Sequence, residues 1–379
     1  REPKDLYPFL EKRWQTHWET YGLHLYQGMM GGPAYPKAQP NASRRDAMPP
    51  EGGRQGSSLS FMQKQHLDPN NVALGILCPL NPSGQGLRNQ DLSAAMVSAT
   101  NDWQIAEWTG KDKRLRASVV VSNEDGVAGA KEIRKRAGDA NFAQVLLMSR
   151  NTEPLGQRRY WPIYEAAAEA GLPVGIHAFG FGGHPITSGG WPSYYIEEMV
   201  GHSQCQQAAL ASLVLEGVFE RFPTLKVISI EAGFGWAPSL AWRLDKHFDR
   251  LRSELPHLKR KPSEYIREHV WWSTQPMEEP EDRQHLFDVR QRDGKVGAQV
   301  PGDLGGRQGE VAVVVQGVDD RLADPHLARI ERTDFELPDQ VLVQVAAAFV
   351  GEFERAVIVV GAGAVAGRRR GFRPRVFHL

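Results

Sequence analysis

Short apolar runs alternate with amphipathic stretches through the middle of the chain. Six runs have the length and the turn-type borders of buried strands. They lie at residues 72–78, 117–121, 143–148, 173–177, 226–231 and 269–273. Between them, apolar positions recur at helical spacing at residues 91–108, 126–137, 159–170, 194–220 and 239–254. This alternation predicts parallel strands that are joined by right-handed helical crossovers.

The number of strands falls short of a closed barrel. A TIM-type (β/α)8 barrel closes with eight parallel strands, and the pattern shows six. We therefore predict an α/β fold of this type that is incomplete by two strands. Residues 72–78 and 269–273 should then lie on the two sides of a gap and should not pair directly.

The N-terminal region adds helices and a long loop. Residues 6–21 show helical spacing up to Gly22, and residues 59–67 predict a second, short helix. The stretch 28–58 between them is rich in Gly, Pro, Asn and Ser and has no period, which predicts a loop or a disordered segment. Because Arg1 stands first instead of Met, we expect the chain to begin inside a longer protein.

The composition changes near residue 289. All 10 Trp, 9 Tyr and 8 Met lie before that point, and Lys295 is the one lysine after it. We therefore divide the chain into a barrel domain, 1–288, and an atypical C-terminal segment, 289–379, which is disordered or arises from a changed reading frame. We expect that this segment does not complete the barrel.

Val-rich runs in the C-terminal segment have strand propensity. They lie at residues 311–317, 340–350 and 355–365. The last run contains Gly361-Ala362-Gly363-Ala364, which is similar to a dinucleotide-binding fingerprint. That fingerprint needs a full βαβ unit and an acidic residue about 20 positions further on, whereas no Asp or Glu follows Glu354. We therefore expect no dinucleotide cofactor.

Charge and composition exclude several classes of partner. The 45 Lys and Arg balance the 45 Asp and Glu, which argues against a broad surface for nucleic acid or an anionic membrane. No apolar run is long enough to span a membrane, and the charged N-terminus lacks a signal-peptide core, so we expect a cytoplasmic protein. Cys78 and Cys205 are too few for a disulfide framework, and we expect two buried thiols.

Three predicted strands end in residues with catalytic chemistry. In a parallel barrel, functional side chains collect at the C-terminal ends of the strands, and these ends carry Arg150, His177 and Glu231. His177 is a candidate metal ligand, because neutral imidazole binds divalent metals. Glu231 is a candidate ligand, general base or charge partner of a metal. Arg150 either clamps a substrate carboxylate or is a solvated loop residue.

Other polar and aromatic residues nearby have simpler explanations. His184 and His202 lie in loop and helix contexts, where we expect hydrogen-bonded or solvated side chains. The aromatic segment 191–195 is expected to pack on the top of the barrel and not to bind a cofactor, and it is also a candidate for the lining of a pocket. The long helix at 194–220 is a candidate surface for packing against a second copy in a homo-oligomer.

Five stretches of the chain are similar to one enzyme family. They are RLRASVVV, YWPIYEAAAEAGLPVGIH, GWPSYYIEEMVGHSQ, LVLEGVFERFPTLKVISIEAGFGWAPSLAWRLD and PSEYIREHV. In this order they resemble the amidohydrolase-related family, in the branch that includes aminocarboxymuconate-semialdehyde decarboxylase. The resemblance covers about residues 4–288. It implies a (β/α)8 barrel with a divalent metal, usually zinc, that hydrolyses C–N or related bonds or removes a carboxylate from a small acid.

The resemblance assigns only part of the family's metal site. His177 matches the ligand after the fifth strand, and Glu231 stands where the decarboxylases often have His. The family's His-x-His pair after the first strand has no counterpart here. The family's Asp after the eighth strand has no counterpart either. Asp324 is followed by Pro325-His326, which resembles only part of the sequence around that Asp. The resemblance thus implies that the first and eighth strands are missing or replaced and that zinc is held weakly.

Two functions stay open on the sequence alone. One is a hydrolase or decarboxylase of the amidohydrolase type with a small-molecule substrate, whose activity is impaired in this chain. The other is a non-catalytic barrel used for binding or assembly. The missing ligands favour the second, whereas His177 and Glu231 favour descent from an enzyme. The fold by itself does not decide between them.

Overall fold

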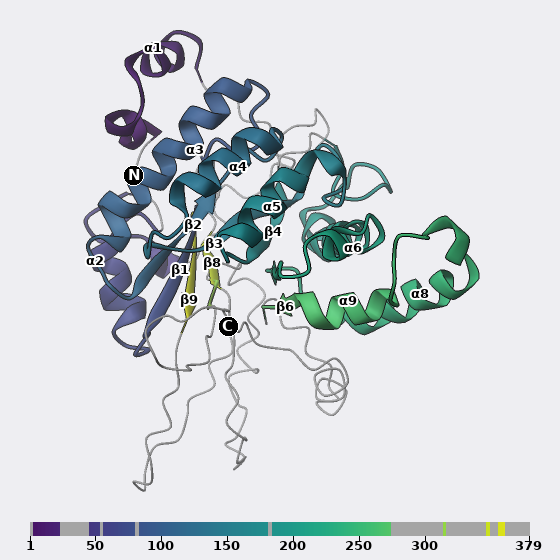
Figure 1. Ribbon diagram of the computed structural model, residues 1–379. Coiled ribbons are helices and arrows are strands. Elements are labelled where there is room, and N and C mark those ends of the chain that lie inside the picture. The colour runs from purple at the N-terminus through teal and green to yellow at the C-terminus, as the bar shows by residue number, and fades with distance from the viewer. Residues whose placement is uncertain are drawn as a thin grey trace, which may run out of the picture.

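The computed structural model describes the chain in eight segments. They are residues 3–22, 45–53, 56–79, 83–180, 184–273, 314–315, 346–348 and 355–360. Within these segments a single sheet runs through the molecule, and helices lie side by side over one of its faces (Figure 1). No helix of the described segments is long and apolar enough to cross a membrane.

Six parallel strands form the part of the sheet that the sequence predicts. They are β1 (Leu74–Pro79), β2 (Leu115–Val120), β3 (Phe142–Arg150), β4 (Val174–Gly180), β5 (Val227–Ile230) and β6 (Val270–Trp272). Each strand pairs in parallel with the next in chain order, and β1 and β6 do not pair with each other. The strands, their parallel pairing and the gap between the first and the last are therefore confirmed. The described residues form an α/β barrel that is not closed.

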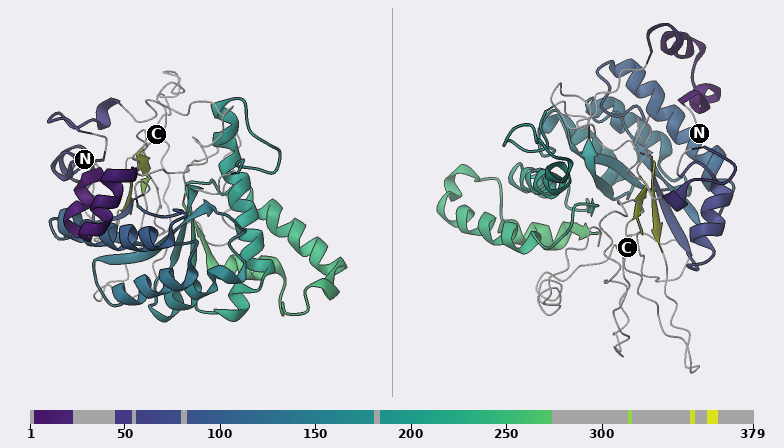
Figure 2. Two further views of the ribbon diagram at one scale, coloured as in Figure 1. Left: turned by 90° about the horizontal axis from the view of Figure 1, so that it is seen from above. Right: turned by 180° about the vertical axis from the view of Figure 1, so that it is seen from behind.

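The helices follow the strands as the alternation predicts. They are α3 (Gln90–Gln104), α4 (Gly126–Arg136), α5 (Trp161–Glu169), α6 (Tyr195–Leu215), α7 (Val218–Arg221), α8 (Ala237–Arg250) and α9 (Pro262–His269). Figure 1 shows α3, α4 and α5 packed side by side, and Figure 2 shows the same ribbon from above and from behind. The predicted helix at 194–220 is divided in two, because Gly217 has a φ of +79°, which is left-handed and ends α6.

Apolar side chains of the strands alternate between two faces. Val119, Leu147 and Ile176 belong to one large core cluster together with Ile163 and Tyr164 of α5. Successive residues of a strand point to opposite faces. The positions next to these core residues therefore face the interior of the open barrel, and the polar residues of the site stand there.

The N-terminal region packs against α3. A 3-10 helix (Pro3–Phe9) is followed by α1 (Lys12–Tyr21), where the sequence predicted one helix. Pro8 within this segment removes a backbone donor and favours the break. Leu10 and Trp14 share a second core cluster with Met96 of α3. The short predicted helix at 59–67 is present as α2 (Leu59–Met62) and a π-helical turn (Gln63–Leu67).

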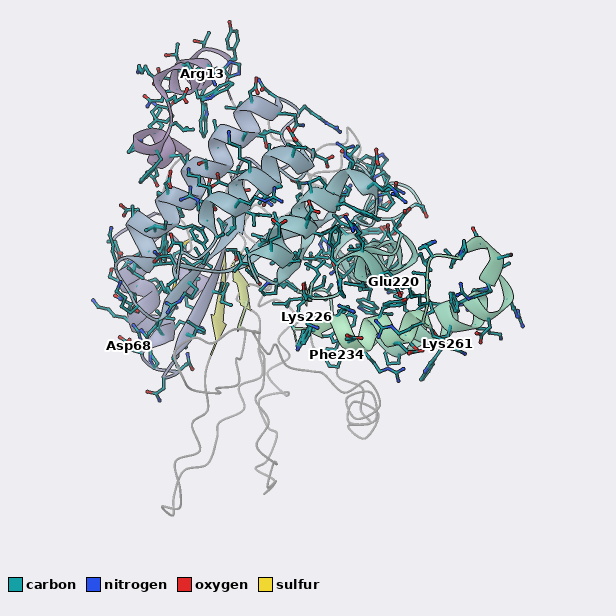
Figure 3. The ribbon with its side chains drawn as sticks, viewed as in Figure 1. Arg13, Asp68, Glu220, Lys226, Phe234 and Lys261 are labelled. Carbon is teal, nitrogen blue, oxygen red and sulfur yellow. The ribbon has the colours of Figure 1, made fainter. Side chains whose placement is uncertain are left out.

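The helices at the β6 end are held together by polar contacts. Glu220 of α7, labelled in Figure 3, accepts a hydrogen bond from the hydroxyl of Tyr265 of α9. Its carboxylate also lies 3.0 Å from Nζ of Lys259. These contacts fasten α9 to α7, and α9 leads directly into β6.

Three short strands from the C-terminal segment extend the sheet beyond β1. β9 (Arg355–Val360) pairs antiparallel with β1, and β7 (Val314–Val315) and β8 (Ala346–Ala348) pair antiparallel with β9. All three fall within the runs predicted to have strand propensity. An antiparallel strand does not supply the missing β/α unit, so the described strands of this segment do not complete the parallel barrel.

Some predictions fall outside the described residues. These are the domain boundary at residue 288, the glycine motif that starts at Gly361, and most of the loop at 28–58. Of that loop, Arg45–Ala47 form a 3-10 helical turn. The division of the chain at residue 288 stays a prediction.

Candidate functional site

His177 and Glu231 form a buried pair at the ends of neighbouring strands. His177 of β4 lies opposite Ile230 of β5 in the parallel register, which places Glu231 one residue further at the same end. His177 Nε2 is 3.0 Å from Glu231 Oε2, and the side chains are 0% and 6% exposed. The two residues, which the sequence placed at the ends of predicted strands, therefore meet at the same end of adjacent strands.

The hydrogen bond of the second ring nitrogen of His177, Nδ1, determines whether Nε2 faces Glu231 as a donor or as an acceptor. Nδ1 lies 2.7 Å from the carbonyl oxygen of Ala178. A carbonyl only accepts hydrogen bonds, so Nδ1 carries a proton. In a neutral ring Nε2 is then an acceptor that faces an oxygen of Glu231, and two acceptors this close need a shared proton or a shared cation. Burial raises the pKa of Glu231, against the opposing effect of His177.

The pair supplies two of the donor atoms that a catalytic metal requires. Donors that bind one ion at about 2.1 Å and at about 90–110° stand about 3.0–3.4 Å apart. The 3.0 Å between Nε2 of His177 and Oε2 of Glu231 meets this condition. A catalytic zinc uses three protein ligands, but in the described part of the chain no group of three or more His, Cys, Asp or Glu could hold an ion. The described residues therefore do not fit a catalytic metal on their own.

Glu231 has an unusual backbone conformation. Its φ is +58°, and among the described non-glycine residues only Asn71 shares a positive φ. This conformation costs a residue with a side chain about 1–2 kcal/mol. Ser273, directly after β6, accepts a hydrogen bond from the Glu231 backbone N–H at 2.9 Å and so helps to hold it. Backbone strain of this kind clusters at functional sites.

Arg150 is buried, and its interpretation as a solvated loop residue is wrong. β3 continues through Arg150, whose side chain is 1% exposed, and Nη1 lies 3.4 Å from Oε1 of the fully buried Glu198 of α6. Burial lowers the pKa of Arg150 to about 10 and raises the pKa of Glu198 to about 7. This distance is long for an ion pair, so the contact offsets little of the cost of burying both charges.

One face of α6 lies along the ends of β3 and β4. The side-chain amide of Gln206 donates to the carbonyl oxygen of Ile176 at 3.4 Å, and the thiol of Cys205 donates to that of Ser149 at 3.4 Å. Glu198 lies two turns earlier on this face. Cys205 is only partly buried, so the prediction of two buried thiols holds for Cys78 alone.

His202 belongs to the same buried face, which the sequence did not indicate. Its side chain is 3% exposed. Its pKa is lowered to about 3, mainly by burial and also by the charges of the neighbouring His177 and Arg150. Of the two predicted alternatives, a hydrogen-bonded or a solvated side chain, the solvated one is therefore wrong. The available signal was its spacing of four residues from Glu198, which puts both on one helix face.

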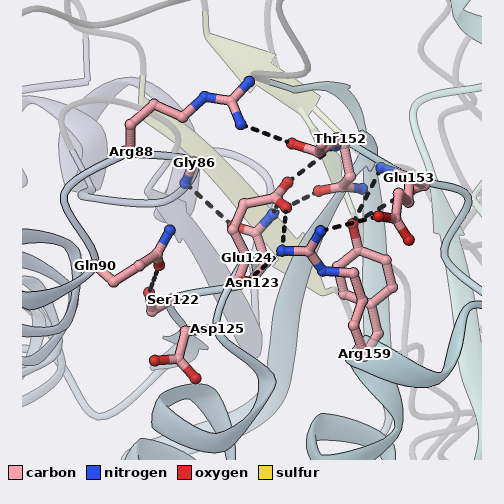
Figure 4. Close-up of polar contacts among 12 residues, drawn as sticks. Gly86, Arg88, Gln90, Ser122, Asn123, Glu124, Asp125, Thr152, Glu153 and Arg159 are labelled. Atoms are coloured by element: carbon pink, nitrogen blue, oxygen red, sulfur yellow. Dashed lines mark hydrogen bonds and ion pairs between the residues drawn. The ribbon is translucent and has the colours of Figure 1, made fainter.

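A network of polar groups ties together the loops at this end of the strands (Figure 4). Asn123, which follows β2, accepts from the backbone N–H of Gly86 at 3.2 Å and donates to the side chain of Asn151 at 2.6 Å. The carbonyl oxygen of Asn151 lies 2.7 Å from Nε2 of His184. His184 is thus hydrogen-bonded, as predicted, and the loops after four strands are linked around the site.

The aromatic segment before α6 does not pack as predicted. Trp191 and Tyr194 are 41% and 70% exposed, so they do not cover the barrel. The segment instead caps α6, because Glu197 accepts hydrogen bonds from the backbone N–H groups of Ser193 and Tyr194 at 2.8 and 2.7 Å.

The burial of Glu198 predicts a pH dependence of stability. Its pKa lies at about 7 in the folded protein, above its ordinary value of 4.5, so the folded state binds more protons between these values. Stability should fall as pH rises from about 4.5 to about 7, by up to about 1.4 kcal/mol per pH unit. Glu198→Gln should remove this fall in urea unfolding between pH 5 and pH 8. The exposed control Glu254→Gln should keep it, and equal curves for wild type and Glu198→Gln would contradict the prediction.

Comparison with known proteins identifies the family. The model of the amidohydrolase family matches residues 14–293, whereas no curated protein matches the chain. Among solved structures, an amidohydrolase from Mycobacterium avium subsp. paratuberculosis K-10 is 28% identical with a TM-score of 0.45, and the match covers 53% of this chain and 52% of that one. The chain thus spans about half the length of this relative.

Two decarboxylases share the fold at lower identity. One is 5-carboxyvanillate decarboxylase LigW from Sphingomonas paucimobilis, with 22% identity, a TM-score of 0.51 and coverage of 62% of this chain and 69% of that one. The other is a dihydroxybenzoic acid decarboxylase from Polaromonas sp. JS666, solved with manganese and the inhibitor 2-nitroresorcinol, with 19% identity, a TM-score of 0.51 and coverage of 62% and 73%. With the family model covering most of its length, this chain belongs to the amidohydrolase family.

Proposed function

We propose that this chain carries the site of a metal-dependent hydrolase or carboxy-lyase of the amidohydrolase type, which acts on a small organic acid or amide. His177 is the metal ligand, Glu231 is the base or the partner of the metal, and Arg150 binds a carboxylate of the substrate. The observation that carries this proposal is the buried contact of 3.0 Å between His177 and Glu231. It lies at the C-terminal ends of parallel strands, where barrel enzymes hold their catalytic groups.

Glu231 is well placed to move a proton. Burial raises its pKa, which brings it closer to neutral pH, where a general base is most effective. Its strained backbone is held by Ser273, and its side chain is held against His177. In this role the carboxylate accepts a proton from the substrate or from water and later returns it.

We further propose that the chain of residues 1–379 has low activity by itself. The described residues supply two donor atoms, from His177 and Glu231, where a catalytic zinc needs three. Zinc is the metal that the sequence resemblance implies. The manganese in the Polaromonas decarboxylase is the reason to test that ion beside zinc.

A second candidate function is binding without turnover. The observation that favours it is that the buried side chains of His177 and Arg150 already contact buried carboxylates, those of Glu231 and Glu198 respectively. A barrel of this kind would bind a small acid or another protein and would release no product. Turnover measurements separate this function from the first.

Turnover by the purified chain is the test of the proposed function. The chain is incubated with Zn²⁺ or Mn²⁺ and a panel of small aromatic acids and amides, and release of carbon dioxide or amine is followed. We expect slow, metal-dependent turnover that Glu231→Gln lowers by roughly 100-fold or more, because an amide accepts no proton. The exposed control Glu254→Gln should match wild type. Turnover that survives metal removal, or that is equal in Glu231→Gln, would reject the proposal.

A further inference from the structure

One edge of the buried Arg150 guanidinium has no partner in the described part of the chain. Nε and Nη2 are both inaccessible to solvent and make no hydrogen bond to any described residue. Nε–H and Nη2–H lie on the same edge of the guanidinium plane, and this edge receives the two oxygens of a carboxylate in a bidentate pair. Buried polar groups are nearly always hydrogen-bonded. Two unpaired N–H donors on one edge of a buried guanidinium therefore indicate a site for a ligand.

The internal partner of Arg150 is a weak one. Glu198 reaches only Nη1, at 3.4 Å, whereas charge-assisted hydrogen bonds are about 2.7–2.9 Å long. Its second oxygen, Oε2, also has no hydrogen-bond partner among the described residues. The contact therefore leaves most of the hydrogen-bonding capacity of both side chains unused.

This charge lies beside the His177–Glu231 pair. Arg150 is opposite Gly180 in the pairing of β3 with β4, on the strand that carries His177. The charges of His177 and Arg150 both lower the pKa of His202 of α6, so the two side chains lie near the same residue. A carboxylate on the open edge of Arg150 would thus lie next to the residues proposed to do the chemistry.

We propose that Arg150 and Glu198 form an anion site that takes the carboxylate of a small organic acid on the Nε and Nη2 edge of Arg150. Glu198 holds Nη1 and competes electrostatically with the bound carboxylate, so it sets the affinity of the site. The inference rests on the proposed function only for the substrate class, since the binding itself requires no metal.

Carboxylate binding is measured on the metal-free chain. Acetate and benzoate are titrated at constant ionic strength in the presence of EDTA, with chloride as the reference anion, and followed by calorimetry and by the rise in Tm that a ligand of the folded state produces. We expect saturable binding of at least one acid by wild type. Arg150→Lys keeps the positive charge but loses the two parallel N–H donors of the guanidinium. It should weaken carboxylate binding about tenfold or more, which is the effect expected for the loss of a charge-assisted hydrogen bond.

Glu198→Gln tests whether Glu198 competes electrostatically with the bound carboxylate. This variant also tests the proposal if Arg150→Lys does not fold. At pH 8, above the pKa of about 7 of Glu198, this substitution removes the negative charge beside Arg150 and should tighten binding several-fold. A merely structural role of Glu198 predicts equal or weaker binding. The exposed Arg250→Lys is the matched control and should bind as wild type does. Wild type that binds neither acid more tightly than chloride, or Arg150→Lys that binds as wild type does, overturns the proposal.

The two proposals can fail separately. Carboxylate binding without metal-dependent turnover would reject the enzymatic function and leave the anion site standing. Turnover that Arg150→Lys does not affect, together with absent carboxylate binding, would reject the anion site alone.

Discussion

The purified chain is expected to retain less than one zinc ion per molecule after dialysis, and His177→Ala is expected to retain none. His177 and Glu231 are 3.0 Å apart, which suits two ligands of one ion, but the described residues offer no group of three ligands. Two donors do not supply the coordination of a catalytic zinc site. Loss of even an indirect contact to a metal ligand weakens binding about 10–100-fold, so loss of a ligand should have at least that effect.

Metal content by mass spectrometry is the measurement, with zinc and manganese loaded separately. His247→Ala is the matched control, because His247 is exposed on α8, and this variant should retain as much metal as wild type. One tightly held ion per wild-type chain would contradict the prediction. It would show that residues outside the described segments complete the site.

Gly180→Ala is expected to be strongly destabilising. A Cβ at Gly180 would lie 2.0 Å from the backbone carbonyl oxygen of Arg150, and the φ of +142° is one that other residues rarely adopt. Neither backbone can yield without breaking the pairing of β3 with β4 at the site. Strain and overpacking of this kind together cost about 2–5 kcal/mol.

Gly138→Ala provides the control for backbone conformation. Its φ is +79°, but an added Cβ there meets nothing within 4 Å, so the cost should be only about 1–2 kcal/mol. Urea unfolding of both variants measures the difference, and a carboxylate titration reports whether Arg150 has moved. Equal losses of stability in the two variants would show that the close approach of Gly180 to Arg150 is not the constraint.

The strands could be predicted from the sequence because their signal is local. Each of the six runs is apolar over its own length, and the helices between them require parallel pairing. That rule alone brought His177 and Glu231 to the same end of neighbouring strands, and their 3.0 Å contact follows from the register of β4 with β5. The family resemblance of the chain also follows from its sequence and agrees with the match over residues 14–293.

The partners of Arg150 could not be predicted in this way. Whether an arginine at a strand end is solvated or buried depends on what covers it, and here α6 places Glu198 against it. The burial of His202 has the same cause, since a helix face acquires its neighbours only when the helix docks on the sheet. The antiparallel pairing of β9 with β1 joins residues far apart in the chain, and no local pattern specifies such a contact. The sequence by itself therefore determined which residues stand at the strand ends, and the tertiary packing decided which of them are buried, paired and available for a ligand.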